Sequence, residues 1–239
     1  MTASRSIQSA EIGANLCATR IHRLGEERHG PELTAAALER TKKGNLITEI
    51  LADDPHLGPF VGHDLPCKEN GFDIEGIAAR GDRIWLGLRG PVLVGWAFLI
   101  ELRVTASKSG TLELAKIGDK ERRYRKHLLK MDGLGIRDLV FWDDDLLILA
   151  GPTMDLTGRL GDVLDQKDNS LNEPGEGTLE RLLALPVDPD GDKAEGLAIY
   201  HCLGEEALLV LYDSPSERRR PAAHAVYGDV FRLPRRTAG

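Results

Sequence analysis

Residues 72–91 read FDIEGIAARGDRIWLGLRGP, an apolar, β-prone run that places an acidic residue, Glu75, directly before a glycine. The pattern predicts a strand (IEGIAAR), a tight turn (GD) and a second strand (IWLGLRG). The same layout returns in GIRDLVFWDDDLLILAGP from residue 135 and in KAEGLAIYHCLGEEALLVLYDSP from residue 193. The stretch is therefore one copy of a repeated β-hairpin unit.

The repeat has a regular period. Glu75, Arg137 and Glu195 occupy the same place in the three units and are 62 and 58 residues apart, while the prolines that close the units are 61 and 63 residues apart. A period near 60 residues leaves room for four strands, which is typical of a β-propeller blade. We therefore predict an all-β fold of β-propeller-like blades, about three in number. A solenoid or a sandwich is the alternative, because periodicity alone does not fix closure. Further strands are expected at residues 96–104, 111–117 and 229–234.

The N-terminal part of the chain has a different texture. Residues 31–51, PELTAAALERTKKGNLITEIL, show the apolar spacing of a helix, divided near Gly44, and a Pro- and Gly-rich connection follows. We divide the chain into residues 1–71, an N-terminal segment with a helical insertion, and residues 72–239, the region of blades.

Three blades are fewer than the four to eight that usually close a propeller, so we expect an incomplete propeller. The N-terminal residues could add irregular strands, further blades could precede Met1, or two copies could associate. We expect residues 31–51 to cover one terminal blade face but not both. Self-association through unpaired blade edges is therefore possible.

Composition narrows the class of protein. A net charge of −7 argues against a protein that binds nucleic acid or anionic membranes in general, since such a protein needs a basic surface. No apolar run approaches the roughly 18 residues of a membrane span. Three dispersed cysteines fit neither a disulfide framework nor a metal site and favour a reducing compartment, so we predict a cytoplasmic protein.

The charged residues of the repeat predict a polar site on the propeller axis. The first strand of each blade lines that axis, so Glu75, Arg137 and Glu195 should converge there. A second set of equivalent positions, two residues before each closing proline, holds Arg89 and Asp213 in the outer units. Either set could form ion pairs between blades, or it could contact a ligand. The candidate ligand-binding residues are Asp73, Glu75, Arg89, Arg137, Asp138, Glu195 and Asp213.

Known catalytic and metal-binding motifs do not match. The acidic stretch VDPDGDKAE at residues 187–195 lacks the glycine and glutamate positions of an EF-hand, and the histidines, including His56 and His63, show no HExxH spacing. No GxSxG motif is present. We assign no metal ligands and no cofactor, and whether the protein is an enzyme stays open.

The segments LPCKENGFDIEGIAARGDRIWLGLRGPVLVGWA, GLGIRDLVFWDDDLLILAGPTMDLTG and KAEGLAIY resemble the bacterial family known as domain of unknown function 3616. The likeness runs from about residue 57 to residue 234, and KENGFDIEGIA and LGLRGP are its most specific parts. It implies a propeller without an established reaction, and it implies blades before the helical segment. The shorter EGIA and EGLA phrases are also similar to those of esterase-like phytase propellers.

Two functional hypotheses remain. The first is a binding or interaction module whose axial site takes a small polar ligand or a protein partner. The alternative, implied by the phytase-like phrases, is a metal-assisted phosphoester hydrolase in which Arg89 or Arg137 stabilises anionic charge. We favour the first hypothesis, because neither a nucleophile nor a set of metal ligands is complete.

Overall fold

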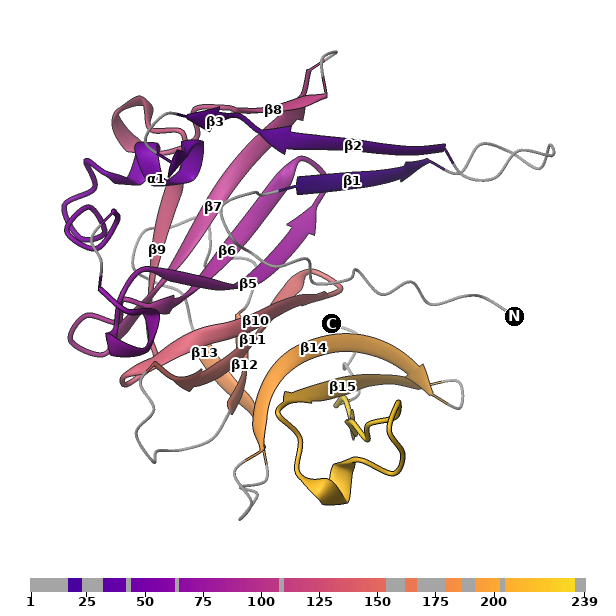
Figure 1. Ribbon diagram of the computed structural model, residues 1–239. Coiled ribbons are helices and arrows are strands. Elements are labelled where there is room, and N and C mark those ends of the chain that lie inside the picture. Colours follow the sequence, from indigo (N-terminus) through magenta and orange to yellow (C-terminus); the bar gives the residue numbers. More distant parts are fainter. Residues whose placement is uncertain are drawn as a thin grey trace.

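The computed structural model describes most of the chain, and strands dominate it (Figure 1). The described residues are 17–22, 32–41, 44–62, 65–107, 110–153, 162–166, 179–185, 192–202 and 205–234. Most of the strands belong to three successive antiparallel sheets, one for each predicted hairpin unit. The predicted all-β, propeller-like fold is thus confirmed.

The first blade is a four-stranded antiparallel sheet in the order β5-β6-β7-β9. Its strands are β5 (Asp73–Arg80), β6 (Arg83–Gly90), β7 (Trp96–Ala106) and β9 (Arg125–Lys130). The far end of β7 leaves this sheet and pairs with β8 (Thr111–Leu114). Strand β8 in turn pairs in parallel with an N-terminal strand, so the N-terminal segment is joined to the first blade.

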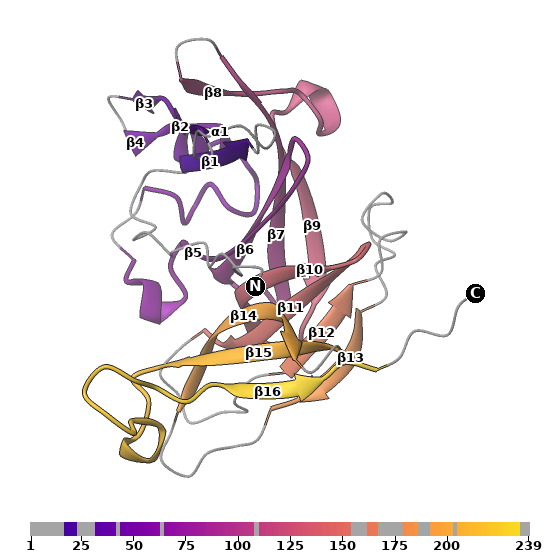
Figure 2. The same ribbon diagram turned by 90° about the vertical axis from the view of Figure 1, so that its right-hand side faces the viewer.

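The second and third blades repeat the pattern. The second is β10 (Leu134–Trp142), β11 (Asp145–Pro152), β12 (Asp162–Gln166) and β13 (Leu179–Ala184). The third is β14 (Lys193–Cys202), β15 (Glu205–Asp213) and β16 (Asp229–Arg232). Strand β10 contacts both β5 and β14, so the first strands of the blades lie next to one another. Figures 1 and 2 show the sheets one after another, with β14–β16 at one end.

The prediction of a helix over residues 31–51 is wrong for most of that segment. Instead the segment forms β2 (Glu32–Leu38), which pairs with β1 (Cys17–His22), followed by β3 (Arg40–Thr41) and β4 (Gly44–Asn45). Ala36 and Leu38 are buried, whereas the residues next to them are more exposed. This alternation is typical of a strand, and an alanine-rich sequence is compatible with it.

The one α-helix of the described residues, α1 (Leu46–Leu51), begins where Asn45 caps it. The Asn45 side chain accepts a hydrogen bond from the Thr48 backbone N–H at 3.0 Å, and the Thr48 hydroxyl lies 3.2 Å from the Asn45 N–H. This capping box fixes the start of the helix at residue 46. Among the described residues, 3₁₀ turns occur at Cys67–Glu69, Asp119–Glu121 and Glu217–Arg219. No helix of the described residues is long and apolar enough to cross a membrane.

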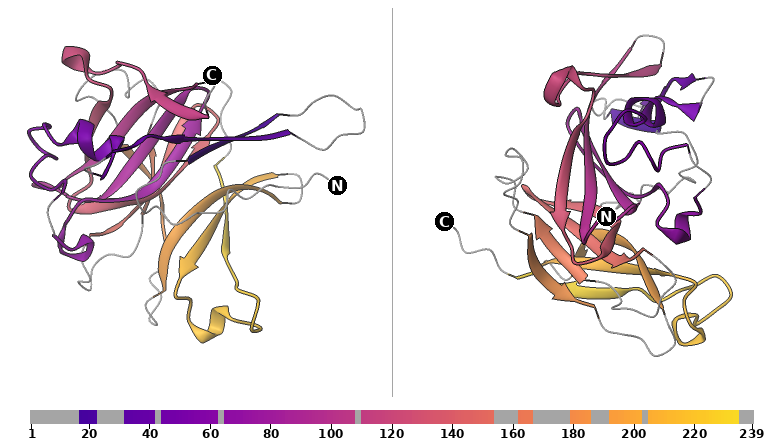
Figure 3. Two further views of the ribbon diagram at one scale, coloured as in Figure 1. Left: turned by 45° about the horizontal axis from the view of Figure 1, so that its top comes forward. Right: turned by 90° about the vertical axis from the view of Figure 1, so that its left-hand side faces the viewer.

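Three apolar layers hold the sheets together. The first lies between the N-terminal segment, with Leu51 and Leu57, and the face of the first blade that includes Leu88, Phe98 and Ile100. The expectation that N-terminal residues cover a terminal blade face is therefore met, although mainly by a short helix and a loop (Figure 3).

The other two layers lie between successive blades, one between the first and second and one between the second and third. Close packing between blades explains Gly87, the first glycine of the motif IWLGLRG. A Cβ at Gly87 would lie 2.2 Å from the Ile136 side chain, so only a glycine allows β10 to pack this closely on β6.

Candidate functional site

A β-bulge occurs at the same place in the first strand of each blade. Ile74 pairs with Leu88 and Gly76 pairs with Gly87, which leaves Glu75 outside the ladder. The registers of β10 and β14 shift in the same way, at Arg137 and at Glu195. A bulged residue is unpaired in the ladder, and its side chain is re-aimed relative to the strand. The charged residues inside the apolar repeats are therefore the bulge residues of three successive blades.

The bulge residues form one chain of ion pairs. Arg137 Nη1 lies 3.2 Å from Glu75 Oε2 and 3.2 Å from Glu195 Oε1, so one guanidinium group links all three blades. Arg137 Nη2 also donates a hydrogen bond to the carbonyl oxygen of Pro152. The convergence that the repeat spacing predicted for these three residues is found in the structure.

Arg89 extends this network within the first blade. It lies at a second register shift, because Asp73 pairs with Gly90 and the next pair is Ile74 with Leu88. Arg89 Nη1 lies 2.9 Å from Glu75 Oε1 and 3.5 Å from Asp73 Oδ2. We call these five residues the axial cluster: Asp73, Glu75, Arg89, Arg137 and Glu195.

The axial cluster is layered by burial. The Arg137 side chain is only 7% exposed and that of Arg89 is similar, whereas the three carboxylates are more exposed, up to 35% at Glu195. Burial raises the pKa of Glu195; Arg137 opposes this, and the negative charges of Glu75 and Asp213 add to it. Three carboxylates and two guanidinium groups give the cluster a net charge of −1 when all are ionised. The solvent-accessible part of the cluster is therefore acidic.

Asp138 and Asp213, the other two candidates, lie outside this ion-pair network. The Asp138 carboxylate accepts hydrogen bonds from the backbone N–H of Leu139 at 2.8 Å and of Leu197 at 2.7 Å, and so ties β10 to β14. Asp213 is exposed, and no hydrogen bond or ion pair joins its side chain to the described residues. Ala150, its counterpart in the second blade, is buried in the apolar layer. The second set of equivalent positions therefore does not pair charges between blades.

The contribution of Asp138 to stability is expected to depend on pH. Burial raises the pKa of Asp138 to about 6 in the folded protein, from an ordinary value of 3.8, although its two backbone hydrogen bonds oppose the shift. Folding thus favours the protonated acid, so this stability is fully present below the ordinary pKa and is lost as pH rises through the folded value. Between about pH 4 and pH 7, the stability of the wild type relative to Asp138→Asn should fall by up to about 3 kcal/mol, because one pKa unit corresponds to about 1.4 kcal/mol.

Urea unfolding of both proteins at several pH values measures this difference. The exposed turn residue Asp132 supplies the control, since Asp132→Asn makes the same change of side chain away from the buried contact between β10 and β14. A stability difference for Asp138→Asn that is constant, or that grows with pH, would contradict the account.

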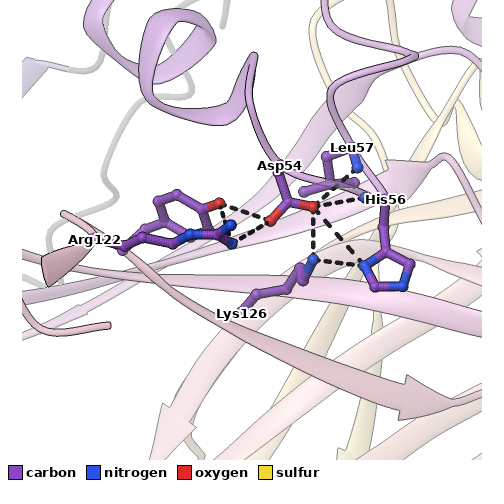
Figure 4. Close-up of polar contacts among 6 residues, drawn as sticks. Asp54, His56, Leu57, Arg122 and Lys126 are labelled. Atoms are coloured by element: carbon purple, nitrogen blue, oxygen red, sulfur yellow. Dashed lines mark hydrogen bonds and ion pairs between the residues drawn. The ribbon is translucent and has the colours of Figure 1, made fainter. Parts of the chain in front are cut away.

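A second polar cluster, which the sequence analysis missed, lies between the N-terminal segment and the first blade (Figure 4). The fully buried Asp54 carboxylate accepts hydrogen bonds from the Tyr124 hydroxyl at 2.6 Å, Lys126 Nζ at 2.6 Å and Arg122 Nη1 at 3.1 Å. The backbone N–H groups of His56 and Leu57 complete the set. Burial alone would raise the pKa of Asp54, but the hydrogen bonds outweigh it and lower that pKa to about 2.

The sequence does contain a signal for this cluster. Arg122, Tyr124 and Lys126 alternate along the segment that leads into β9, so an extended backbone there directs them to one side, while Asp54 begins a Pro-containing turn. His56, considered only as a metal ligand, instead contacts Lys126 through Nδ1 at 2.9 Å. We interpret the cluster as the attachment of the N-terminal segment to the first blade.

A third buried acid lies within the first blade. Glu101 contacts Arg83 at 2.6 Å, His127 at 3.0 Å and Arg125 at 3.3 Å, and these residues come from three neighbouring strands. Burial would raise the pKa of Glu101, but the basic neighbours outweigh it and lower that pKa. Among the residues that the structure describes, no group of three or more His, Cys, Asp or Glu side chains is arranged to hold a metal ion.

Fold and site together define a propeller-like arc of blades with a charged cluster where the first strands meet. The family model described as a protein of unknown function, DUF3616, matches residues 13–229, so the chain belongs to that family. The resemblance to this family that the sequence showed is thereby confirmed. Comparison with curated proteins and with solved structures gave no match.

Proposed function

We propose that the protein is a binding module and that its axial cluster takes a small organic cation. The observation that carries this proposal is the layering of the cluster, with buried guanidinium groups beneath more exposed carboxylates. A ligand approaching from solvent meets carboxylate oxygens first. An ammonium group can pair with these oxygens as a charge-assisted hydrogen-bond donor.

The electrostatics favour a cation over an anion. Both arginines already contact carboxylates, so an anion would have to displace Glu75, Glu195 or Asp73 to reach them. Glu195 also lies in a field to which Glu75 and Asp213 add negative charge. A positively charged group bound beside Glu195 would offset the repulsion between these three carboxylates.

Calorimetric titration with putrescine, an organic diamine, tests the proposal against inorganic phosphate as the anionic probe. We expect putrescine to bind and phosphate not to bind. Glu195→Gln keeps the side-chain size but removes the charge, and it should weaken putrescine binding about tenfold or more, which corresponds to about 1.4 kcal/mol.

The matched control is Glu113→Gln, which removes the same charge from an exposed position on β8 and should leave the affinity unchanged. The absence of putrescine binding would overturn the proposal. Binding of phosphate alone, or equal affinities for the wild type and Glu195→Gln, would also overturn it.

The remaining assignments are proposals as well. We propose that residues 72–239 form the binding region, that residues 1–71 act as its covering segment, and that the protein works in the bacterial cytoplasm. A metal-assisted phosphoester hydrolase stays the second hypothesis. It rests on two short phrases of sequence, and no observation on the described residues adds to it.

A further inference from the structure

The third blade has one apolar sheet face that the described residues leave uncovered. Cross-strand pairing places Ala198, Leu209 and Val230 on this face, together with Leu211 and Tyr200. Leu211 is 46% exposed, and Tyr200 and Val230 are exposed to a similar degree. We call these five residues the outer face of the third blade. The sheet lies at one end of the series of blades in Figure 2.

The equivalent positions in the other blades are covered by the next blade. Counted from the bulge, the pair Gly196–Leu211 corresponds to Asp138–Leu149 in the second blade, and Leu149 is fully buried against the third blade. In the first blade the corresponding pair is Gly76–Gly87, and Ile136 of the second blade packs directly on it.

The positions equivalent to Tyr200 in the other two blades are also covered by the next blade. The equivalent of Tyr200 in the second blade is Trp142, which donates a hydrogen bond from Nε1 to Glu206 of the third blade at 3.0 Å. Its equivalent in the first blade is Arg80, whose guanidinium lies 3.9 Å from the ring centroid of Phe141 in the second blade. The outer face of the third blade is therefore built like two faces that each receive another sheet.

We infer that the outer face of the third blade binds the same face of a second copy of this chain. Within the described residues, the other blade faces are already covered: the N-terminal segment covers the first blade, and neighbouring blades cover both faces of the second. Among the sheet faces of the described residues, a second copy therefore offers its own outer face. Two identical faces that bind each other give a two-fold symmetric dimer.

The rim of the face suits such a pairing. At one end Lys193 pairs with Asp213 across the ladder, and at the other end Arg232 Nε lies 3.1 Å from Glu205 Oε2. Each end thus carries one basic and one acidic residue, so two copies can meet without an excess of like charge, whichever way the strands run. An apolar centre with a charged rim is the usual anatomy of a protein interface.

Light scattering coupled to size-exclusion chromatography, across the micromolar range, tests the inference on the full chain. We expect a dimer for the wild type. A lysine on the apolar face would place a charge among the apolar side chains of the second copy, so Leu211→Lys and, independently, Val230→Lys should each raise the dimer dissociation constant at least about tenfold. Circular dichroism establishes that each variant is folded, and the second variant decides the outcome if the first does not fold.

The matched control is Leu128→Lys, because Leu128 is also an exposed leucine within a strand, 41% exposed, but lies on the first blade. This variant should remain a dimer. A monomeric wild type would overturn the inference, whatever other partner the face binds. A dimer that persists in folded Leu211→Lys and Val230→Lys would also overturn it.

Discussion

Replacing Asp54 with alanine is expected to lower the free energy of unfolding by about 3–5 kcal/mol, the usual effect of removing one partner from a buried ion pair. The Asp54 carboxylate is fully buried and accepts hydrogen bonds from Tyr124, Lys126 and Arg122. Without it, the Lys126 ammonium would lie largely buried with no anionic partner. Two backbone N–H groups of the following turn would also lose their acceptor.

Urea unfolding at neutral pH measures this effect. Asp53→Ala is the matched control, because Asp53 is the adjacent residue and is exposed, and we expect it to change stability by less than about 0.5 kcal/mol. If Asp54→Ala were as stable as this control, the cluster of Figure 4 would not attach the N-terminal segment to the first blade.

The second large effect is expected at Arg137. Replacing it with methionine should lower the free energy of unfolding by about 3 kcal/mol, the lower end of the range for a broken buried pair, since the carboxylates that it pairs with are partly exposed. Glu75 and Glu195 would face each other without a cation between them. The Pro152 carbonyl would also lose its donor.

Chemical unfolding of Arg137→Met beside Arg123→Met measures the difference. Arg123 is exposed, so its replacement should leave stability almost unchanged. Equal stability for the two variants would mean that the ion pairs between blades add nothing to the fold.

The blade pattern could be predicted from the sequence because it repeats. Each repeat carries its own strand–turn–strand signal, and a common period places equivalent residues such as Glu75, Arg137 and Glu195 at one end of their sheets. What the pattern could not supply is the register. A bulge shifts the ladder by one residue, and no feature of a single hairpin predicts that shift reliably.

Residues 31–51 could not be assigned correctly for a related reason. The run TAAAL satisfies a helical period and a strand period equally well, and pairing with β1 and β8 decides in favour of the strand. The Asp54 cluster joins residues about 70 positions apart, which repeat spacing does not relate. Such contacts depend on how the N-terminal segment packs on the first blade, and this is a property of tertiary structure alone.

The central claim is that bulge residues of successive blades meet in one axial cluster. A double-mutant cycle between Glu75 and Arg137 tests it most directly, because these residues come from different blades and lie 62 positions apart. The cycle compares the unfolding free energies of the wild type, Glu75→Gln, Arg137→Met and the double variant. We predict a coupling energy of about 0.5–3 kcal/mol, the range measured for residues in one ion-pair network. Additive effects of the two substitutions would show that the side chains do not meet, and would contradict the account.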